Sequence, residues 1–358
     1  MIQNWISRCF SSRWGEKSIV YYAPGGVEAW SPEDYGMLKG GSQLAVYHNA
    51  KEWNKLGYQV TIYGQLLKEG IYDGVRYLKF SRFNRFDQFN ILIIWRGYNF
   101  DLLKFPLKAR RIVADLHDFF EPKYMHVKGV EKIDSFVFHS HYARSKVSGL
   151  ADEKVAVIPN GYLFEYSKLA DTVKEPFRLI YAGQYFRGLE LMLQFGWPLI
   201  KGAVPQAELH IYGGWPEMGL SKLGPGTRWR NRMMELMAQP GIFHHGQVDR
   251  ERLIKERAMS AIHYYGCTFE EFDCITVRES MAVGCVPVTT DFAALYDKPY
   301  CVKISGDPLL RQTQESVALK VAELLKDQNR LDEIRKEFLE LVKDETWENL
   351  AKEWVKCF

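Results

Sequence analysis

The sequence has no excess of charge of either sign and few cysteines. Its 358 residues include 47 lysine and arginine against 44 aspartate and glutamate side chains, a formal net charge of +3. This balance gives no electrostatic reason to expect nucleic acid as the main partner. The six cysteines form no C-x-x-C pair and no cluster with the spacing of a zinc site. We therefore expect buried free thiols in a reducing compartment, which favours a cytoplasmic protein.

The sequence also lacks a hydrophobic run long enough to cross a bilayer, for which about 20 residues are needed. Apolar runs such as residues 91–95 have the length of a strand. Residues 1–14 have neither the apolar core nor the cleavage site of a secretory signal. They fit a short amphipathic helix that touches a membrane surface, although a frayed or packed terminal helix is the simpler interpretation. We expect at most peripheral contact with a membrane.

What the sequence does contain is an alternation of β-rich and helical stretches. The composition, 47% hydrophobic and 25% charged, is that of a folded chain, and the length favours two domains. Alternation of this kind is typical of parallel sheets covered by helices, so the fold class is α/β. Six strands are expected in each half of the chain, at 18–22, 59–63, 91–95, 111–114, 135–138 and 155–158, and at 178–182, 208–212, 242–245, 261–264, 286–290 and 301–304.

The two sets of strands predict two Rossmann-like sheets in tandem. A polar stretch at 167–176 ends in proline and separates the sets, so we place the domain boundary between residues 170 and 171. The C-terminal region predicts amphipathic helices at 312–327 and 329–343. A final helix at 346–358 carries apolar residues at spacings of three and four, and this face needs a groove to dock in.

The most informative segment is FEEFDCITVRESMAVGCVPVTT, residues 269–290. Glu271 precedes a helix expected at 275–283, and Glu279 lies within that helix. The backbone N–H groups at the start of this helix would lie at the carboxyl end of the sheet, together with the positive end of the helix dipole. Such a helix terminus suits a diphosphate. An equally open interpretation is a capping box formed by Thr276 and Glu279, in which Glu279 only serves the backbone.

A second candidate anion site follows the strand at 178–182. Gln184 and Arg187 lie in a short turn, and Gly188 opens the next helix. Arg187 could hold a phosphate through two N–H groups. Read alone, the segment is better explained by a solvated arginine beside a turn.

Two features of the first half are weaker signals. Gly40 and Gly41 could let the backbone approach a ligand closely, although the full G-x-G-x-x-G pattern is missing. The strand RIVADL ends at His117, where α/β sheets present ligand-binding groups. A lone histidine in that place is more often structural.

In their order and spacing these segments resemble the retaining glycosyltransferases of family 4. The resemblance covers nearly the whole chain and rests on GGS at 40–42, VIPNG at 157–161, AGQYFRG at 182–188, Glu271-x7-Glu279 and TWENLAKEW at 346–354. It implies the GT-B architecture, with two Rossmann-like domains facing each other across a cleft. Residues 1–170 would hold the acceptor and 171–345 the nucleotide sugar, while the helix at 346–358 crosses back to the first domain.

The resemblance also implies roles for single residues of the second domain. Glu271 would contact the hydroxyls of the donor sugar, and Glu279 would accept hydrogen bonds from the ribose. Arg187 would neutralise the diphosphate in place of the usual lysine. Backbone amides of three further residues would bind the sugar and phosphate, namely Cys274, Ile275 and Thr276. Two positions depart from the family: Gln184 replaces a second phosphate-binding arginine, and Cys274 replaces a frequent glycine.

In the first domain the resemblance implies that His117 hydrogen-bonds the transferred sugar. Gly40 and Gly41 would approach the phosphate and the sugar of the donor. The sequence contains no D-x-D, so we expect no metal and no further cofactor. Arg187 and helix N-termini would then stabilise the leaving diphosphate.

The predicted activity is retaining transfer of a hexose or similar sugar from a UDP- or GDP-linked donor to a glycan, lipid or protein-linked acceptor. Two alternatives remain open. One is a GT-B protein that binds a nucleotide sugar with little turnover, for which Gln184 is the motivating feature. The other is a nucleotide-sugar 2-epimerase, which would use acid and base carboxylates in the same region.

Overall fold

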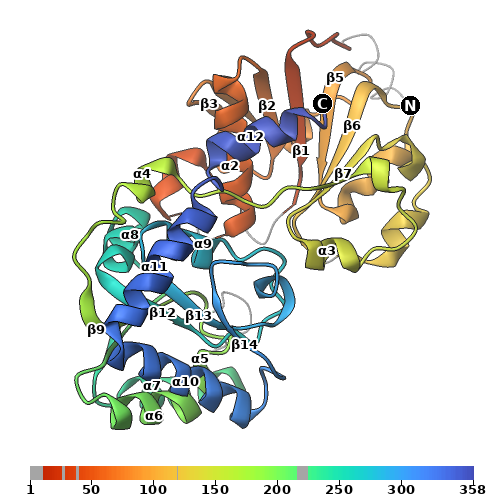
Figure 1. Cartoon of the computed structure of the whole chain (residues 1–358). Coiled ribbons are helices and arrows are strands. Elements are labelled where there is room, and N and C mark those ends of the chain that lie inside the picture. The colour runs from red at the N-terminus through yellow and green to blue at the C-terminus, as the bar shows by residue number, and fades with distance from the viewer. Residues whose placement is uncertain (1–10, 26–28, 38–39, 119, 216–224) are drawn as a thin grey trace. The chain divides into compact units, whose positions relative to one another are not determined.

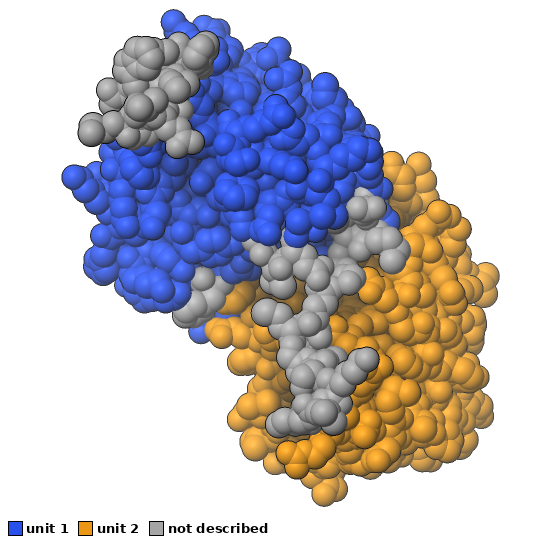
Figure 2. Space-filling view, turned by 180° about the vertical axis from the view of Figure 1, so that it is seen from behind, with its two compact units in different colours: residues 1–161, 347–358 blue, residues 162–346 orange. Residues whose placement is uncertain are grey.

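The computed structural model describes residues 11–25, 29–37, 40–118, 120–215 and 225–358. The chain forms two compact units, which Figure 2 colours separately. Unit 1 comprises residues 1–161 and 347–358, and unit 2 comprises residues 162–346. The boundary therefore precedes the polar stretch at 167–176 in which the sequence analysis placed it. Most of the N-terminal helix expected at 1–14 lies outside the described residues.

Unit 1 contains an eight-stranded sheet with the order β3-β4-β2-β1-β5-β6-β7-β8. All neighbouring strands are parallel except β3 and β4. The order reverses between β1 and β5, so the topological switch point of this sheet lies there. The strands are β1 (Ser18–Ala23), β2 (Gln59–Gly64), β3 (Gly70–Tyr72), β4 (Val75–Lys79), β5 (Gln88–Trp95), β6 (Lys108–Leu116), β7 (Ser135–Phe138) and β8 (Val155–Val157).

The long helices of unit 1 are α2 (Gly41–Lys55) and α12 (Trp347–Val355), which lie side by side in Figure 1. The ring of Trp354 packs edge-on against Trp53 of α2, with 5.4 Å between the ring centroids. The apolar face of the last helix thus docks within unit 1, as expected. Shorter elements are η1 (Pro32–Met37), η2 (Phe80–Arg82), η3 (Gly97–Lys104), η4 (Pro122–His126), η5 (Val130–Lys132), α3 (His141–Ser145) and η6 (Asp152–Lys154).

Unit 2 contains a six-stranded, fully parallel sheet with the order β11-β10-β9-β12-β13-β14. In chain order this is 3-2-1-4-5-6, the arrangement of a dinucleotide-binding Rossmann sheet, with its switch point between β9 and β12. The strands are β9 (Glu175–Ala182), β10 (Glu208–Tyr212), β11 (Ile242–Gly246), β12 (Ser260–Tyr265), β13 (Val286–Thr290) and β14 (Val302–Ile304).

Helices surround this second sheet, and their apolar faces form the core of unit 2 with the buried strands. They are α4 (Phe164–Ser167), α5 (Leu189–Leu191), η7 (Met192–Gly196), α6 (Trp197–Ala203), α7 (Pro225–Met237), α8 (Arg250–Met259), α9 (Ile275–Ala282), η8 (Ala293–Leu295), α10 (Arg311–Lys326) and α11 (Gln328–Val342). In the part of the chain that the structure describes, no helix is both long and apolar enough to span a bilayer.

All twelve expected strands are present, because long apolar runs are typical of parallel strands buried on both faces. The sequence analysis missed the hairpin of β3 and β4. Its turn is Asp73-Gly74, with both residues in the left-handed region at φ 48° and 79°. An Asp-Gly pair between alternating apolar residues is a strong hairpin signal, so the sequence did contain the information.

Candidate functional site

Arg187 and Glu271 meet at the carboxyl edge of the sheet of unit 2. Arg187 follows β9 and Glu271 follows β12, so the switch point brings together two residues that are 84 positions apart. The guanidinium donates a hydrogen bond to Glu271 Oε1, and Tyr265 donates to the same oxygen at 2.8 Å. Burial alone would lower the pKa of Arg187, but the carboxylate of Glu271 raises it above its ordinary value. The cation is therefore permanent.

The turn that carries Arg187 is held against the loop after β12. Gly188 has φ 107°, and a Cβ atom there would lie 2.5 Å from the carbonyl oxygen of Gly266. Thr268 N–H donates to the carbonyl of Arg187 at 3.3 Å. The carbonyl of Gln184 accepts hydrogen bonds from the Tyr181 hydroxyl and the Arg187 N–H. Only glycine fits this close approach of two loops, which explains the Arg-Gly pair.

Helix α9 begins at Ile275 with an uncapped N-terminus. Its N-cap Cys274 lies in the left-handed region at φ 64° and ψ 74°, no side chain caps the helix, and its first turn has no acidic residue. This conformation favours glycine, so it gives a physical reason for the glycine that the family resemblance expects at this position. Without a side-chain cap or an acidic residue in the first turn, the positive helix end is available to an anion.

The capping-box interpretation is wrong. Thr276 is the second residue of α9, not its N-cap. Its hydroxyl donates to the carbonyl of Ala182 at 2.9 Å and accepts from Arg257 at 2.6 Å. Thr276 thus joins the end of β9 to the start of α9, beside the switch point between β9 and β12.

Glu279 is buried between two arginines of helix α8. Arg250 donates to Oε1 and Arg257 donates to Oε2. Burial would raise the pKa of Glu279, but the two guanidinium groups outweigh it and lower the pKa below its ordinary value. The sequence analysis missed both arginines, although their spacing of seven places them on one helix face. Glu279 is a fixed, ionised acceptor.

The ion pairs of Arg187, Glu271 and Glu279 together contain more positive than negative charge. Three guanidinium groups, those of Arg187, Arg250 and Arg257, face two carboxylates, those of Glu271 and Glu279. One positive charge remains, and the N-terminus of α9 adds to it. This edge is suited to a ligand that is itself strongly anionic.

In unit 1, Gly40 and Gly41 lie at the start of α2, with Gly40 as an extended N-cap at φ −91° and ψ 126°. Arg96 follows β5 and has a left-handed φ of 65°. Arg96 donates to the hydroxyl of Ser42 at 2.8 Å and forms an ion pair with Asp118. It therefore ties the first turn of α2 to the loop after β6.

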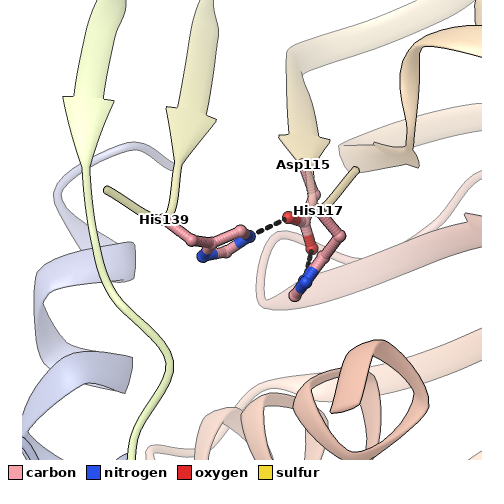
Figure 3. A group of neighbouring side chains, drawn as sticks. All are labelled: Asp115, His117 and His139. Atoms are coloured by element: carbon pink, nitrogen blue, oxygen red, sulfur yellow. Dashed lines mark hydrogen bonds and ion pairs between the residues drawn. The ribbon is translucent and has the colours of Figure 1, made fainter. Parts of the chain in front are cut away.

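His117 follows β6 and lies in a cluster that the sequence analysis did not foresee (Figure 3). Its Nε2 is 3.2 Å from Oδ2 of Asp115, and His139 Nε2 is 2.8 Å from Oδ1. Tyr21 donates its hydroxyl hydrogen to Asp115 Oδ2. Asp115 and His139 are polar residues at the ends of otherwise apolar strand runs, and that pattern could have revealed them.

The charges of this cluster follow from burial and proximity. Burial would raise the pKa of Asp115, but the imidazole rings of His117 and His139 outweigh it and lower the pKa well below its ordinary value. Burial lowers the pKa of His117, and the carboxylate of Asp115 opposes this only in part. At neutral pH Asp115 is ionised and His117 is neutral.

The same three side chains are also a candidate metal site. Among the described residues, Asp115, His117 and His139 form the group whose ligand atoms lie within 4.8 Å of one another. However, each histidine nitrogen faces its own oxygen at 2.8 or 3.2 Å, within or at the limit of the hydrogen-bond range. The five cysteines in the described part of the chain are all buried and free.

No family model matches the sequence. The curated proteins contain no match either. Solved structures do match. A glycosyltransferase from Rickettsia africae has a TM-score of 0.70 at 12% identity, over 96% of this chain and 98% of that one. Sucrose-phosphate synthase from Thermosynechococcus elongatus has a TM-score of 0.69 at 12% identity, over 95% and 98%.

A third match is HepE from Anabaena, solved in complex with UDP and glucose. Its TM-score is 0.68 at 11% identity, over 95% of this chain and 98% of that one. Sequence identity this low supports a shared fold but not a shared activity. The chain has the GT-B fold of glycosyltransferases, as the sequence resemblance implied.

Proposed function

We propose that the protein is a retaining glycosyltransferase that moves a hexose or similar sugar from a nucleoside-diphosphate sugar to a glycan, lipid or protein-linked acceptor. The observation that carries the proposal is the pair of Arg187 and Glu271 at the switch point of unit 2, beside the uncapped N-terminus of α9. A permanent cation, free helix N–H groups and a fixed carboxylate are what a diphosphate joined to a sugar requires.

The leaving diphosphate would be stabilised by Arg187 and by the amides of Cys274, Ile275 and Thr276. Negative charge develops on the phosphate oxygen as the glycosidic bond breaks. Donors that already point at this oxygen lower the barrier, because they need no reorganisation. We propose that this arrangement replaces a metal ion. Gln184, at the turn that precedes Arg187, would supply a neutral contact to the phosphates.

The sugar and the ribose would be held by carboxylates. Glu271 uses Oε1 for Arg187 and Tyr265, and its other oxygen would accept hydrogen bonds from sugar hydroxyls. Glu279 is already bound to Arg250 and Arg257. A carboxylate offers about four lone-pair positions, so further acceptance from ribose hydroxyls is compatible with these bonds.

For unit 1 we propose the roles that the family resemblance implies. His117 would hydrogen-bond the transferred sugar near its anomeric carbon, and Gly40 and Gly41 would let the backbone approach the donor. The acceptor oxygen would attack the anomeric carbon from the face that the diphosphate leaves. The acceptor proton would pass to the leaving phosphate oxygen, and attack and departure on one face retain the configuration.

UDP-glucose is the first donor to test. HepE was solved with UDP and glucose, and the structure of a trehalose-6-phosphate protein from E. coli contains UDP-2-fluoro glucose, at a TM-score of 0.67 and 13% identity over 95% of this chain and 98% of that one. GDP-mannose serves as the alternative. We expect release of nucleoside diphosphate that depends on an acceptor from a panel of glycans and glycolipids. The rate should not change with chelator, and the product should keep the donor's anomeric configuration.

Variants test the site itself. We expect Arg187→Ala to lower kcat/KM by about 10²–10³-fold, the effect of losing one donor to a developing oxyanion. Glu271→Gln should lower it as well, while the surface variant Arg232→Ala, which breaks only an exposed pair with Glu235, serves as the control. Wild-type activity retained by both site variants would refute the assignment. UDP binding without turnover would instead support the non-catalytic alternative, and an epimerised sugar formed without acceptor would support the epimerase.

A further inference from the structure

The hydrogen-bond partners of the His139 ring determine which of its two nitrogens carry a proton. Its Nδ1 lies 2.8 Å from the carbonyl oxygen of Ile158, and its Nε2 lies 2.8 Å from Oδ1 of Asp115. A backbone carbonyl and an ionised carboxylate can only accept hydrogen bonds, so both ring nitrogens must donate. His139 is therefore a buried imidazolium, and its charge balances that of Asp115.

Both oxygens of the Asp115 carboxylate accept hydrogen bonds. It accepts from His139 at one oxygen and from Tyr21 at the other, and its exposed fraction is 0%. A buried carboxylate with several donors has a defined orientation, because any rotation would leave a buried polar atom without a partner. Asp115 presents Oδ2 to the remaining member of the cluster, His117.

His117 has one choice of tautomer in this setting. Its Nε2 lies 3.2 Å from Asp115 Oδ2, a close contact whose angles do not make a hydrogen bond, and it has no hydrogen-bond partner among the described residues. A lone pair on Nε2 would face the negative carboxylate, whereas an N–H at Nε2 is attracted to it. Because the ring is neutral, a proton on Nε2 leaves the lone pair on Nδ1.

We propose that Asp115 and His139 are positioning residues that fix His117 as the neutral tautomer with its proton on Nε2. Nδ1 of His117 is then a hydrogen-bond acceptor for a hydroxyl group of the transferred sugar. This inference rests on the proposed function, in which His117 contacts that sugar. It assigns the direction of the hydrogen bond, from sugar to histidine, and it explains why a carboxylate and a second histidine are buried behind the first.

A bound metal is the competing explanation for the same three side chains. Metal ligands of one ion face a common point, whereas here the two histidine nitrogens face different oxygens of Asp115. Tyr21, a further donor to the carboxylate, also suits a hydrogen-bonded anion. Two hydrogen bonds and the close contact of His117 with Asp115 therefore account for the cluster, and metal content becomes an outcome of the test.

The decisive variant is Asp115→Asn, with Asp101→Asn as the matched control. The side chain of Asp101 is 73% exposed and forms an ion pair with Lys104 on the surface. An asparagine at position 115 can turn its N–H toward His117, which favours the opposite tautomer. We expect kcat to fall by about 10²-fold or more, as for other histidines whose tautomer or position is lost, with the donor KM little changed. Asp101→Asn should match the wild type.

A readout independent of activity is the imidazole ¹⁵N spectrum of histidine-labelled protein, with the His117 signals assigned by their loss in His117→Gln. In the wild type we expect the proton of His117 on Nε2, and we expect this to change in Asp115→Asn. Because a glutamine keeps donors that the leucine lacks, His139→Gln should retain more of kcat than His139→Leu. Circular dichroism and thermal unfolding show which variants are folded.

The outcomes separate the two proposals. Unchanged kcat in a folded Asp115→Asn variant, or a wild-type proton on Nδ1 of His117, overturns the positioning role. So does a stoichiometric metal in the purified wild type that is lost on Asp115→Asn. If the wild type transfers no sugar from any donor, the proposed function fails, and the ¹⁵N spectrum still decides the tautomer.

Discussion

The carboxyl edges of the two sheets share a topology and differ in charge. At both switch points the strand order reverses beside the first strand of the sheet. In unit 2, three arginines face two glutamates. In unit 1 the described charges at the switch point are paired, Arg96 with Asp118 and Asp115 with His139. This difference in charge agrees with the proposal that unit 2 binds the anionic diphosphate, because an unpaired positive charge attracts an anion.

The largest effect that we expect from this comparison concerns two aspartates that follow strands at these edges. Asp273 is buried between Arg278 and Lys298, whereas Asp118 is 48% exposed beside Arg96. Asp273→Ala leaves buried cations without their counterion and should lower the free energy of unfolding by about 3–5 kcal/mol. Asp118→Ala should cost at most about 1 kcal/mol. Urea unfolding of both variants measures this, and similar losses would contradict the difference in burial.

The next effect concerns the nucleotide itself. We expect Arg187→Ala to weaken UDP binding by about 10–100-fold, which corresponds to a charged hydrogen bond of about 1.5–3 kcal/mol. Arg96→Ala should leave UDP binding nearly unchanged, because we assign the nucleotide to unit 2, whereas Arg96 belongs to unit 1 and pairs there with Asp118 and Ser42. Isothermal titration calorimetry with UDP checks the pair. An equal loss in both variants would contradict the proposal that unit 2, and not unit 1, binds the nucleotide.

A smaller effect concerns acid pH and one buried histidine in each unit. Burial lowers the pKa of His263 well below its ordinary value, and the charge of Arg257 lowers it further. Burial also lowers the pKa of His117, but Asp115 opposes the shift. Near pH 6.5 each of these histidines binds a proton in the unfolded chain, whereas in the native protein it stays neutral. The free energy of unfolding therefore falls as the pH drops below about 6.5.

Each such histidine contributes at most about 1.4 kcal/mol per pH unit. We expect His263→Phe to flatten the dependence between pH 7 and 5 more than His117→Phe does, as measured by urea unfolding at several pH values. Equal flattening in the two variants would mean that the carboxylate of Asp115 does not oppose the lowering of the His117 pKa.

The smallest effect concerns the left-handed N-cap of α9. Cys274→Ala keeps a side chain at φ 64°, whereas Cys274→Gly removes it, and both lose the buried thiol. We expect the glycine variant to be more stable than the alanine variant by about 1 kcal/mol. In an ordinary backbone conformation the order would be reversed. Thermal unfolding of the two variants decides the sign.

Much of this arrangement could be predicted from the sequence, for reasons of local chemistry. The expected strand at 135–138 matches β7 and the helix expected at 275–283 matches α9 closely, because buried runs and the glycine after the helix are local signals. The hairpin turn Asp73-Gly74 was a local signal too and was overlooked. The capping box failed although its pattern was present, because Thr276 lies inside the helix and bonds to β9 instead.

The partners within each site could not be predicted in the same way. Nothing local to Glu279 indicates that Arg250 and Arg257 will enclose it, and nothing local to His117 indicates that His139 and Tyr21 will share its aspartate. These contacts depend on which strands become neighbours, and the order of strands in a sheet is a property of the whole chain.

Taken by itself, the amino-acid sequence determined the strands, most helix limits and the sign of each charge, since these follow from neighbours along the chain. The tertiary structure alone decided which charges meet. Parallel sheets collect their strand ends at one edge, so residues from distant segments acquire partners, protonation states and roles that no single segment contains.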